Sequence, residues 1–398
     1  MRKYLSCLSQ RYALGLLSSN FLGRLPNGMG TLAIVLFLRA HDASYRQVGA
    51  GAAVYGLCAA AGGPVLGRMV DLRGQLVTLL SGAIGSGAGF LILALSGGGP
   101  FPLKLVAVAM AGLLMPPLEP ALRSLWSTVL PDEETVEVAY ALDTALQSIL
   151  FVSGPLIVVL LIDLTSTTIT LVATGLLGVL GTGLFVLYPP VRRWRGERHA
   201  RHWAGALRSK LLVMILASMA CVGAVVGVFN VATVAYSEDR GLPGFSGVLL
   251  GAFSLGSLIG GLTYGAWNWS IDPMRRMRLL VLGFAITTWP LLSVADAPVM
   301  VVAMLITGLG LAPMLTCGFV VIGKVAPRGT VTEAFAWVTA VFLGGSALGS
   351  VLTGFMLSGG GLRASFAGAG ALATAGFLVI LAAHPASPIG ERAGEASK

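Results

Sequence analysis

Long apolar stretches alternate with short polar ones along the whole chain. A helix needs about 20 mostly apolar residues to cross the hydrocarbon core of a membrane, and twelve stretches are long enough. The polar connections between them are short, with one exception near the middle of the chain. The predicted transmembrane segments are 12–38, 48–70, 76–96, 102–126, 138–162, 166–188, 210–236, 246–269, 278–295, 298–324, 333–357 and 365–384.

The exceptional connection, 189–209, is rich in Arg and divides the chain near its middle. We therefore predict an N-terminal six-helix bundle over 1–188 and a C-terminal six-helix bundle over 210–384. Residues 189–209 are expected to form a basic cytoplasmic linker, and 385–398 a cytoplasmic tail.

The two predicted bundles also share a repeated pattern of residues. Matching positions lie 195 to 200 residues apart, about half the chain length. Two six-helix halves in the same orientation are one of the repeat types found in transporters. The fold class predicted is therefore an all-α membrane protein with two pseudo-symmetric six-helix halves. The matching sets are Gly51, Ala52, Gly56 with Gly251, Ala252, Gly256; Gly62, Gly63, Gly67 with Gly260, Gly261, Gly265; Pro117, Pro131 with Pro313, Pro327; and Ala139, Ala141, Thr144 with Ala334, Ala336, Thr339.

Composition excludes a soluble protein. Of the 398 residues, 56% are hydrophobic and only 11% are charged, and the mean hydropathy is +0.85. A soluble domain carries about 25% charged residues, so this chain lacks the polar surface to cover a globule in water.

The net charge of +9 reflects topology rather than nucleic-acid binding. If both termini are cytoplasmic, 20 Lys and Arg residues fall on the inner side and 5 on the outer side. Positive residues accumulate on the cytoplasmic side of membrane proteins. This distribution predicts a multi-pass protein with both termini in the cytoplasm.

Cysteine usage suggests neither a disulfide framework nor a metal site. The four cysteines are far apart, with no Cys-x-x-Cys pair and no His/Cys cluster, which favours buried small hydrophobic side chains. No cofactor is expected. The cysteines are Cys7, Cys58, Cys221 and Cys317.

One loop carries a recognisable motif. The pattern Gly67-x-x-x-Asp71-x-x-Gly74, with Arg68 and Arg73 inside it, lies between the second and third predicted helices. It resembles the signature loop of the major facilitator superfamily (MFS), the large family of twelve-helix secondary transporters. Two further stretches, 23–26 and 332–337, look similar to a bacterial drug-efflux-like branch, which implies the cytoplasmic membrane of a bacterium.

The resemblance implies a mechanical role for the loop. In the family, the Asp of this motif meets the start of helix 11 and latches the outward-facing state. Here the matching residues are Asp71 and the region near Thr332, with Gly67 and Gly74 allowing close approach. A helix N-terminus carries partial positive charge, so a carboxylate is well suited to such a contact.

The first predicted helix contains polar groups that a membrane span rarely tolerates. Asn20, Arg24 and Asn27 share one face, at i, i+4 and i+7. Charged residues within spans face the bundle interior and pair with one another. Arg24 lies near the middle of the membrane, so it is either part of the transport site or a permanently paired structural residue.

Candidate partners for Arg24 are two carboxylates. Asp143 lies on the fifth helix with Tyr140 and Gln147 on the same face, and Glu119 lies on the fourth. In the family, helices 1, 4, 7 and 10 line the central cavity, so both acids could meet Arg24. Either acid is a candidate proton carrier, or a structural partner of the arginine.

Other features of the family are weaker here. In the C-terminal half, Asn230 on helix 7 is the best polar candidate. The mid-helix-4 arginine of many proton-coupled members is missing, since Arg123 is expected near the inner end of that helix. The glycine motif of helix 5 is reduced to Gly154-Pro155.

The function predicted is proton-coupled export of small lipophilic molecules by alternating access. The expected partners are a small-molecule substrate, protons and the lipid bilayer, without nucleic acid, and the protein is expected to be a monomer. One alternative is an uptake symporter or facilitator for a small polar or anionic solute. Another is a membrane receptor or assembly factor that transports nothing. No constellation of catalytic residues points to an enzyme.

Overall fold

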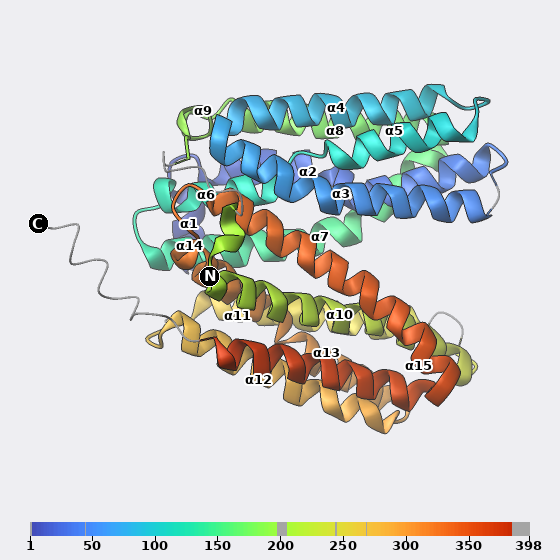
Figure 1. Ribbon diagram of the computed structural model, residues 1–398, viewed down its shortest axis with the longest axis vertical. Coiled ribbons are helices and arrows are strands. Elements are labelled where there is room, and N and C mark those ends of the chain that lie inside the picture. The colour runs from blue at the N-terminus through green and yellow to red at the C-terminus, as the bar shows by residue number, and fades with distance from the viewer. Residues whose placement is uncertain (1, 44, 197–204, 243–244, 268, 384–398) are drawn as a thin grey trace, which may run out of the picture.

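The computed structural model describes residues 2–43, 45–196, 205–242, 245–267 and 269–383, and this part of the chain is helical throughout, without strands. Figure 1 shows the helices in two groups, one above the other, with their axes roughly along the same direction. The helices are α1 (Arg2–Ser9), α2 (Ala13–Ala40), α3 (Tyr45–Arg73), α4 (Gln75–Leu95), α5 (Phe101–Leu113), α6 (Leu118–Val129), α7 (Glu133–Leu164), α8 (Thr167–Val186), α9 (Pro189–Arg193), η1 (Gly205–Arg208), α10 (Lys210–Asp239), α11 (Phe245–Ala266), α12 (Pro273–Thr288), η2 (Trp289–Ser293), α13 (Ala297–Gly308), α14 (Leu311–Val325) and α15 (Val331–Ala382).

The twelve-helix layout predicted from hydropathy is confirmed, with each predicted segment occupied by helix. Eleven helical stretches are long and apolar enough to cross a membrane. The exception is the ninth segment. There α12 has 16 residues and begins earlier than predicted, because the Asp272 side chain accepts the backbone N–H groups of Met274 and Arg275.

Two of the predicted spans are broken near their middle. The fourth consists of α5 and α6, separated by a turn at 114–117 that contains Pro116 and Pro117. Proline lacks a backbone N–H and clashes with the preceding helical turn. The tenth consists of α13 and α14, separated at 309–310. These breaks occur in corresponding helices of the two halves.

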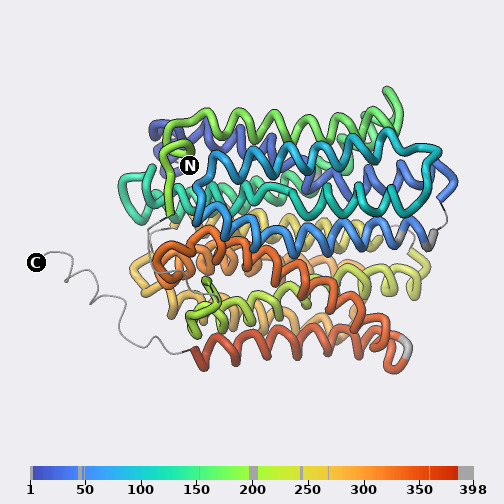
Figure 2. The backbone as a smooth tube through the Cα atoms, turned by 45° about the horizontal axis from the view of Figure 1, so that its top comes forward, coloured from blue at the N-terminus to red at the C-terminus, as the bar shows by residue number. Residues whose placement is uncertain are grey.

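The last two predicted spans form one helix assignment, α15, which reverses direction at Gly361. This residue has φ +67° and ψ −159°, values outside the helical region. Only glycine adopts such angles without strain. Figure 2 shows the two arms of α15 running in opposite directions.

The internal repeat appears in space as a repeated contact between the halves. A Cβ atom placed on Gly67 of α3 would lie 2.9 Å from the Cβ of Ala336 on α15. A Cβ on Gly265 of α11 would lie 2.6 Å from the Cβ of Ala141 on α7. These four positions are matched pairs of the repeat, so each half packs a glycine against an alanine of the other.

The outer surface is apolar, as a lipid-facing surface requires. Large exposed side chains include Leu57, Val106, Leu156, Leu348 and Phe355, from both halves. In water such a surface would aggregate. The middle of the predicted linker, 197–204, and the whole predicted tail, 385–398, lie outside the described residues.

Candidate functional site

Four charged side chains meet inside the N-terminal half. Arg24 comes from α2, Glu119 and Arg123 from α6, and Asp143 from α7. We call these four residues the charge cluster. Glu119 and Arg123 share one face of α6, because they are four residues apart.

The cluster is a closed ring of ion pairs. Arg24 Nη1 donates to Asp143 Oδ1 at 2.5 Å, and its Nη2 lies 3.3 Å from Glu119 Oε2. Arg123 Nε donates to Asp143 Oδ2 at 2.8 Å, and its Nη2 lies 2.5 Å from Glu119 Oε1. Each carboxylate therefore bridges the two guanidinium groups. When all four groups are ionised, the ring carries no net charge.

The two carboxylates differ in their access to solvent. The Asp143 side chain is fully buried, whereas that of Glu119 is 10% exposed. Removing one member of a buried charge set leaves its partner uncompensated, at a cost of several kcal/mol. Asp143 therefore holds the arginines together, while Glu119 is the acid that water can reach.

The other predicted polar residues are distributed around the cluster. Asn20 is buried, and its Nδ2 donates to the Leu118 carbonyl at 2.7 Å, which ties α2 to the start of α6. The Tyr140 hydroxyl donates to the Arg123 carbonyl at 3.4 Å. Asn27 and Gln147 line the adjacent cavity. Asn230 is exposed and is not among the residues that line this cavity.

Arg123 is the member of the charge cluster that was not identified from the sequence. It is predicted near the inner end of the fourth helix, and it lies six residues before Val129, where α6 ends. After the break at 114–117, Arg123 lies six residues into α6 and is only 2% exposed within the cluster. Its spacing of four residues from Glu119 was the signal in the sequence that could have identified it.

A cavity of about 390 Å³ lies between the halves and against the cluster. Glu119 and Arg123 form part of its wall, and Phe319 of α14 lies beside them. From there its lining extends along α2 and α3 to Thr31 and Tyr55. The volume is typical of sites for small organic molecules, and most of the lining is apolar.

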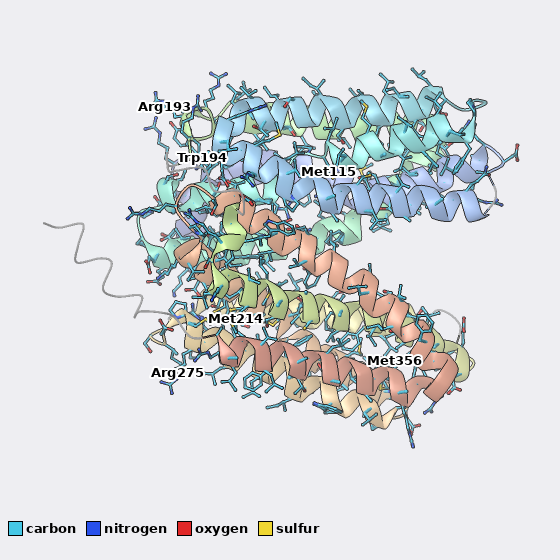
Figure 3. All side chains as sticks on the ribbon, in the orientation of Figure 1. Met115, Arg193, Trp194, Met214, Arg275 and Met356 are labelled. Atoms are coloured by element: carbon cyan, nitrogen blue, oxygen red, sulfur yellow. The ribbon has the colours of Figure 1, made fainter. Side chains whose placement is uncertain are left out.

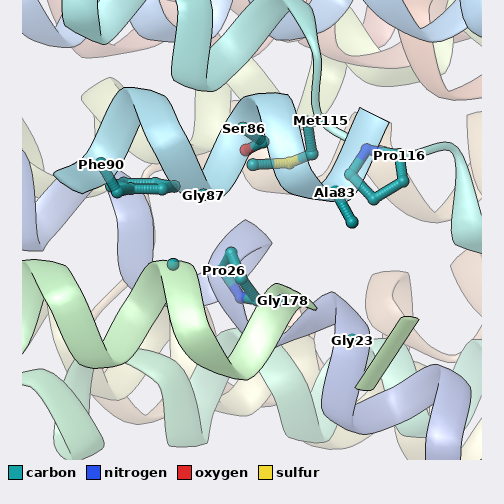
Figure 4. A pocket seen from close by; sticks show the side chains of 10 residues that line it. Gly23, Pro26, Ala83, Ser86, Gly87, Phe90, Met115, Pro116 and Gly178 are labelled. Carbon is teal, nitrogen blue, oxygen red and sulfur yellow. The ribbon is translucent and has the colours of Figure 1, made fainter. Parts of the chain in front are cut away.

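A second, much smaller cavity lies within the N-terminal half. It measures about 10 Å³ and is lined by residues that include Pro26, Ser86, Met115 and Gly178. Figure 4 shows Pro26 of α2 facing α4 and α8 across this space. A void of this size holds at most one water molecule. It has no room for a substrate.

Asp71 of α3 contacts the start of α15 across the boundary between the halves. Its Oδ1 accepts the backbone N–H of Thr332 at 3.2 Å, and its Oδ2 accepts that of Glu333 at 2.8 Å. These N–H groups have no acceptor within the helix. Gly67 permits the approach, and Gly74, with φ +93°, makes the tight turn that follows. Arg73 is exposed.

We call the end of the molecule that carries this contact the latch end. In Figure 1 it lies on the left, where α1, α6, α9 and α14 are labelled. Figure 3 shows Arg193 and Arg275, from opposite halves, both at this end.

Further contacts join the halves at the latch end. Arg276 Nη2 of α12 lies 2.8 Å from Glu137 Oε1 of α7, and both side chains are largely buried. Lys324 Nζ lies 2.6 Å from Glu133 Oε2. The Tyr4 hydroxyl of α1 donates to the Leu262 carbonyl of α11 at 2.5 Å. The cavity is therefore closed off toward the latch end.

Within the described part of the chain, no group of three or more His, Cys, Asp and Glu side chains could hold a metal ion. The charge cluster has two acids, and both are occupied by arginine. Within the cluster the four side chains therefore neutralise one another as ion pairs.

Comparison with known sequences defines the class of protein. The profile of the Major Facilitator Superfamily matches residues 16–297 and 243–397, which together span nearly the whole chain. The chain belongs to this superfamily, whose members are transporters. No curated protein matches the chain in sequence.

Solved structures share the fold at low sequence identity. A bacterial homologue of the iron transporter ferroportin, in an outward-facing state, is 13% identical with a TM-score of 0.79 over 93% of this chain and 98% of that one. The human organic anion transporter MFSD10 is 14% identical, with a TM-score of 0.67 over 95% and 99%. The E. coli fucose:proton symporter is 13% identical, with a TM-score of 0.69 over 94% and 98%. The chain therefore has the MFS transporter fold.

Proposed function

We propose that the protein exports small lipophilic molecules in exchange for protons, by alternating access between its two halves. One observation carries the proposal: a neutral ring of two arginines and two acids forms the wall of the cavity, and one of the acids reaches it. A proton that arrives through the cavity can neutralise Glu119 without entering the fully buried site of Asp143.

The cavity suits an apolar substrate with a few polar groups. Phe151, Leu315 and Phe342 contribute apolar surface to it. Gln147, which also lines the cavity, has a buried Oε1 without a hydrogen-bond partner among the described residues. This atom is available to accept a hydrogen bond from a substrate.

The side of the membrane on which the latch end lies sets the order of steps in the proposed exchange cycle. With both termini in the cytoplasm, as the Lys and Arg distribution favours, the latch end is cytoplasmic. The structure then represents a state closed toward the cytoplasm. Proton entry from outside in this state, followed by opening of the latch end, is one half of an exchange cycle.

Uptake of a small anionic solute is the second candidate. Arg123 Nη1 is buried without a hydrogen-bond partner among the described residues, so it could bind an anionic group. Against this, both arginines already contact two carboxylates, which leaves no net positive charge to attract an anion. A receptor that transports nothing would show no flux in either direction.

The test is accumulation of toxic and fluorescent compounds in efflux-deficient cells, with and without an uncoupler. Wild type would be compared with Glu119→Gln and Asp143→Asn. Asp163→Asn is the matched control, because this exposed acid lies on the same helix as Asp143 but outside the cluster. We expect cells with wild type or the control variant to accumulate less compound than cells without the protein. The uncoupler should remove this difference, and cells with either cluster variant should not show it. Raised accumulation would support uptake instead.

A further inference from the structure

Arg123 contacts two groups of different kinds at once. The N–H edge of its guanidinium group faces Glu119 and Asp143. Its Cζ lies 3.5 Å from the centroid of the Phe319 ring, on α14 of the other half. A guanidinium over an aromatic face is attracted by the ring quadrupole, most strongly where water is excluded. Arg123 is 2% and Phe319 3% exposed.

Phe319, which lines the cavity, belongs to a cluster of three buried rings. It packs edge-to-face against Tyr140 of α7 and Phe335 of α15, with centroids 6.2 Å away in both cases. Tyr140 and Phe335 pack against each other at 6.0 Å. Phe335 lies two residues after Glu333, whose N–H donates to Asp71. The charge cluster is thus connected to the Asp71 latch through the Phe319 ring.

We propose that Arg123 and Phe319 transmit the protonation state of Glu119 to the latch end. This inference rests on the proposed proton coupling. With both acids ionised, two charged acceptors orient the guanidinium plane so that its face lies against Phe319. Protonation of Glu119 removes the charge of one acceptor group and leaves the cluster with a net positive charge. The guanidinium then turns toward water in the cavity, the stack is lost, and the latch end opens.

The charged groups that face Glu119 are few. Arg24 approaches from α2, Arg123 from its own helix, and Asp143 acts from α7 through the shared arginines. On α14, the charged side chain Lys324 contacts Glu133 instead. After protonation of Glu119, the positive charge that is no longer neutralised therefore lies on the two arginines.

The expected size of the effect follows from the strength of the contact. Loss of a cation–π contact changes a two-state population between about twofold at exposed sites and about thirtyfold at desolvated ones. The Arg123–Phe319 contact is of the desolvated kind. We expect a change of about tenfold or more in the population with an open latch.

Amide hydrogen exchange of the purified protein tests the inference and requires no attached probe. The amides of Thr332 and Glu333 are hydrogen-bonded to Asp71, so their exchange, corrected for intrinsic pH dependence, reports latch opening. Phe319→Leu should accelerate it about tenfold at pH 8, and Glu119→Gln should do the same. Phe319→Trp, which keeps an aromatic face, should stay near wild type and guards against misfolding of the leucine variant.

The decisive comparison is the double variant. If the stack transmits the charge state, Glu119→Gln adds nothing in a Phe319→Leu background, because the signal has no path left. Multiplying effects would overturn the inference, since independent sites are additive in free energy. Proton-driven transport, measured in parallel, tests the proposed function separately. If wild-type transport did not depend on protons while the exchange rates of the double variant remained non-additive, the proposed proton exchange would be rejected. The role of the Arg123–Phe319 contact would still be supported.

Discussion

The two acids of the charge cluster contact the same arginines in unequal surroundings. Asp143 is shielded from water, and Glu119 lines the cavity. A sequence reading treats them as equivalent, because each is one carboxylate on an apolar helix. Their different burial predicts a structural role for Asp143 and a role in proton transfer for Glu119.

Replacing each acid by its amide should separate these roles. Asp143→Asn leaves two buried arginines with one carboxylate, and we expect a loss of about 3 kcal/mol of stability. Glu119→Gln should cost about 1 kcal/mol, because nearby water can compensate. Thermal unfolding midpoints in one detergent measure both. Equal midpoints for the two variants would contradict the assignment.

Asp71 is the residue on which the latch is expected to depend. Asp71→Asn removes the charge that interacts with the start of α15, a contact of up to about 2 kcal/mol in partly buried sites. We expect intact folding and a population shifted toward the open latch. Alkylation of Cys317, which is fully buried, should accelerate in this variant.

Asp132→Asn is the matched control for this substitution. Asp132 is an exposed acid at the same end, and it accepts the N–H of Thr135 within its own half. That hydrogen bond lowers the pKa of Asp132. No change in Cys317 alkylation with Asp71→Asn would reject the latch.

At the scale of elements, the approach of α3 to α15 depends on one glycine. Gly67→Ala would place a methyl group 2.9 Å from the Cβ of Ala336, whereas Gly63→Ala on the same helix meets nothing within 4 Å. Both substitutions raise helix propensity by about 1 kcal/mol. Their difference therefore isolates the contact between the halves.

We expect Gly67→Ala to accelerate exchange of the Thr332 and Glu333 amides by tenfold or more. Gly63→Ala should leave this exchange unchanged while raising thermal stability slightly. Similar exchange rates in the two variants would show that α15 can move away from α3 without a loss of free energy.

The short helix α1 is a second element that joins the halves. Lys3 pairs with Glu134 of its own half, while Tyr4 donates to the other half. Cys7, on the same helix, is fully buried, and burial raises its pKa to about 11. The thiolate is the reactive form, so Cys7 should be nearly inert at pH 8.

Alkylation of Cys7 thus measures detachment of α1. Tyr4→Phe should raise the rate about fivefold, the effect of losing one hydrogen bond of about 1 kcal/mol. Ser6→Ala, at an exposed position on the same helix, is the control. In all variants the rate should rise with pH up to about 11, because the thiolate fraction rises. A rate that levels off near pH 9, the ordinary pKa of a thiol, would contradict the burial of Cys7.

At the scale of the whole molecule, the two halves use different chemistry at matched positions. The Gly67–Ala336 and Gly265–Ala141 contacts follow the repeat. The Asp71 contact does not, because the position 198 residues later is Trp269. Instead, Arg276 pairs with Glu137 on that side. The Asp71 contact and the Arg276–Glu137 pair at the latch end are therefore unrelated by the repeat.

These two contacts should contribute additively to closure. Asp71→Asn and Glu137→Gln share no partner, and effects at independent sites add in free energy. The double variant should show the product of the two single changes in the open population. Distances between spin labels at Ser127 and Arg275, in protein with its native cysteines replaced by alanine, measure that population. Strong non-additivity would mean that one latch element controls both contacts.

Hydropathy and repeat spacing were sufficient to predict the twelve helices and the two halves. These features are local, since each helix must satisfy its own backbone within the membrane. The sequence also placed Arg24, Glu119 and Asp143 in the membrane, where a buried charge requires a partner. The position of Asp71 before a turn at Gly74 could likewise be predicted from the sequence motif.

Only the tertiary structure determined how these residues meet. The closed ring needs Arg123, which lies on α6 after the break at 114–117 and contacts the same two carboxylates as Arg24. The contact with Phe319 depends on the approach of two halves that are about 200 residues apart in sequence. Partner choice among buried charges is set by helix rotation and spacing over the whole bundle, and local sequence patterns do not encode these quantities.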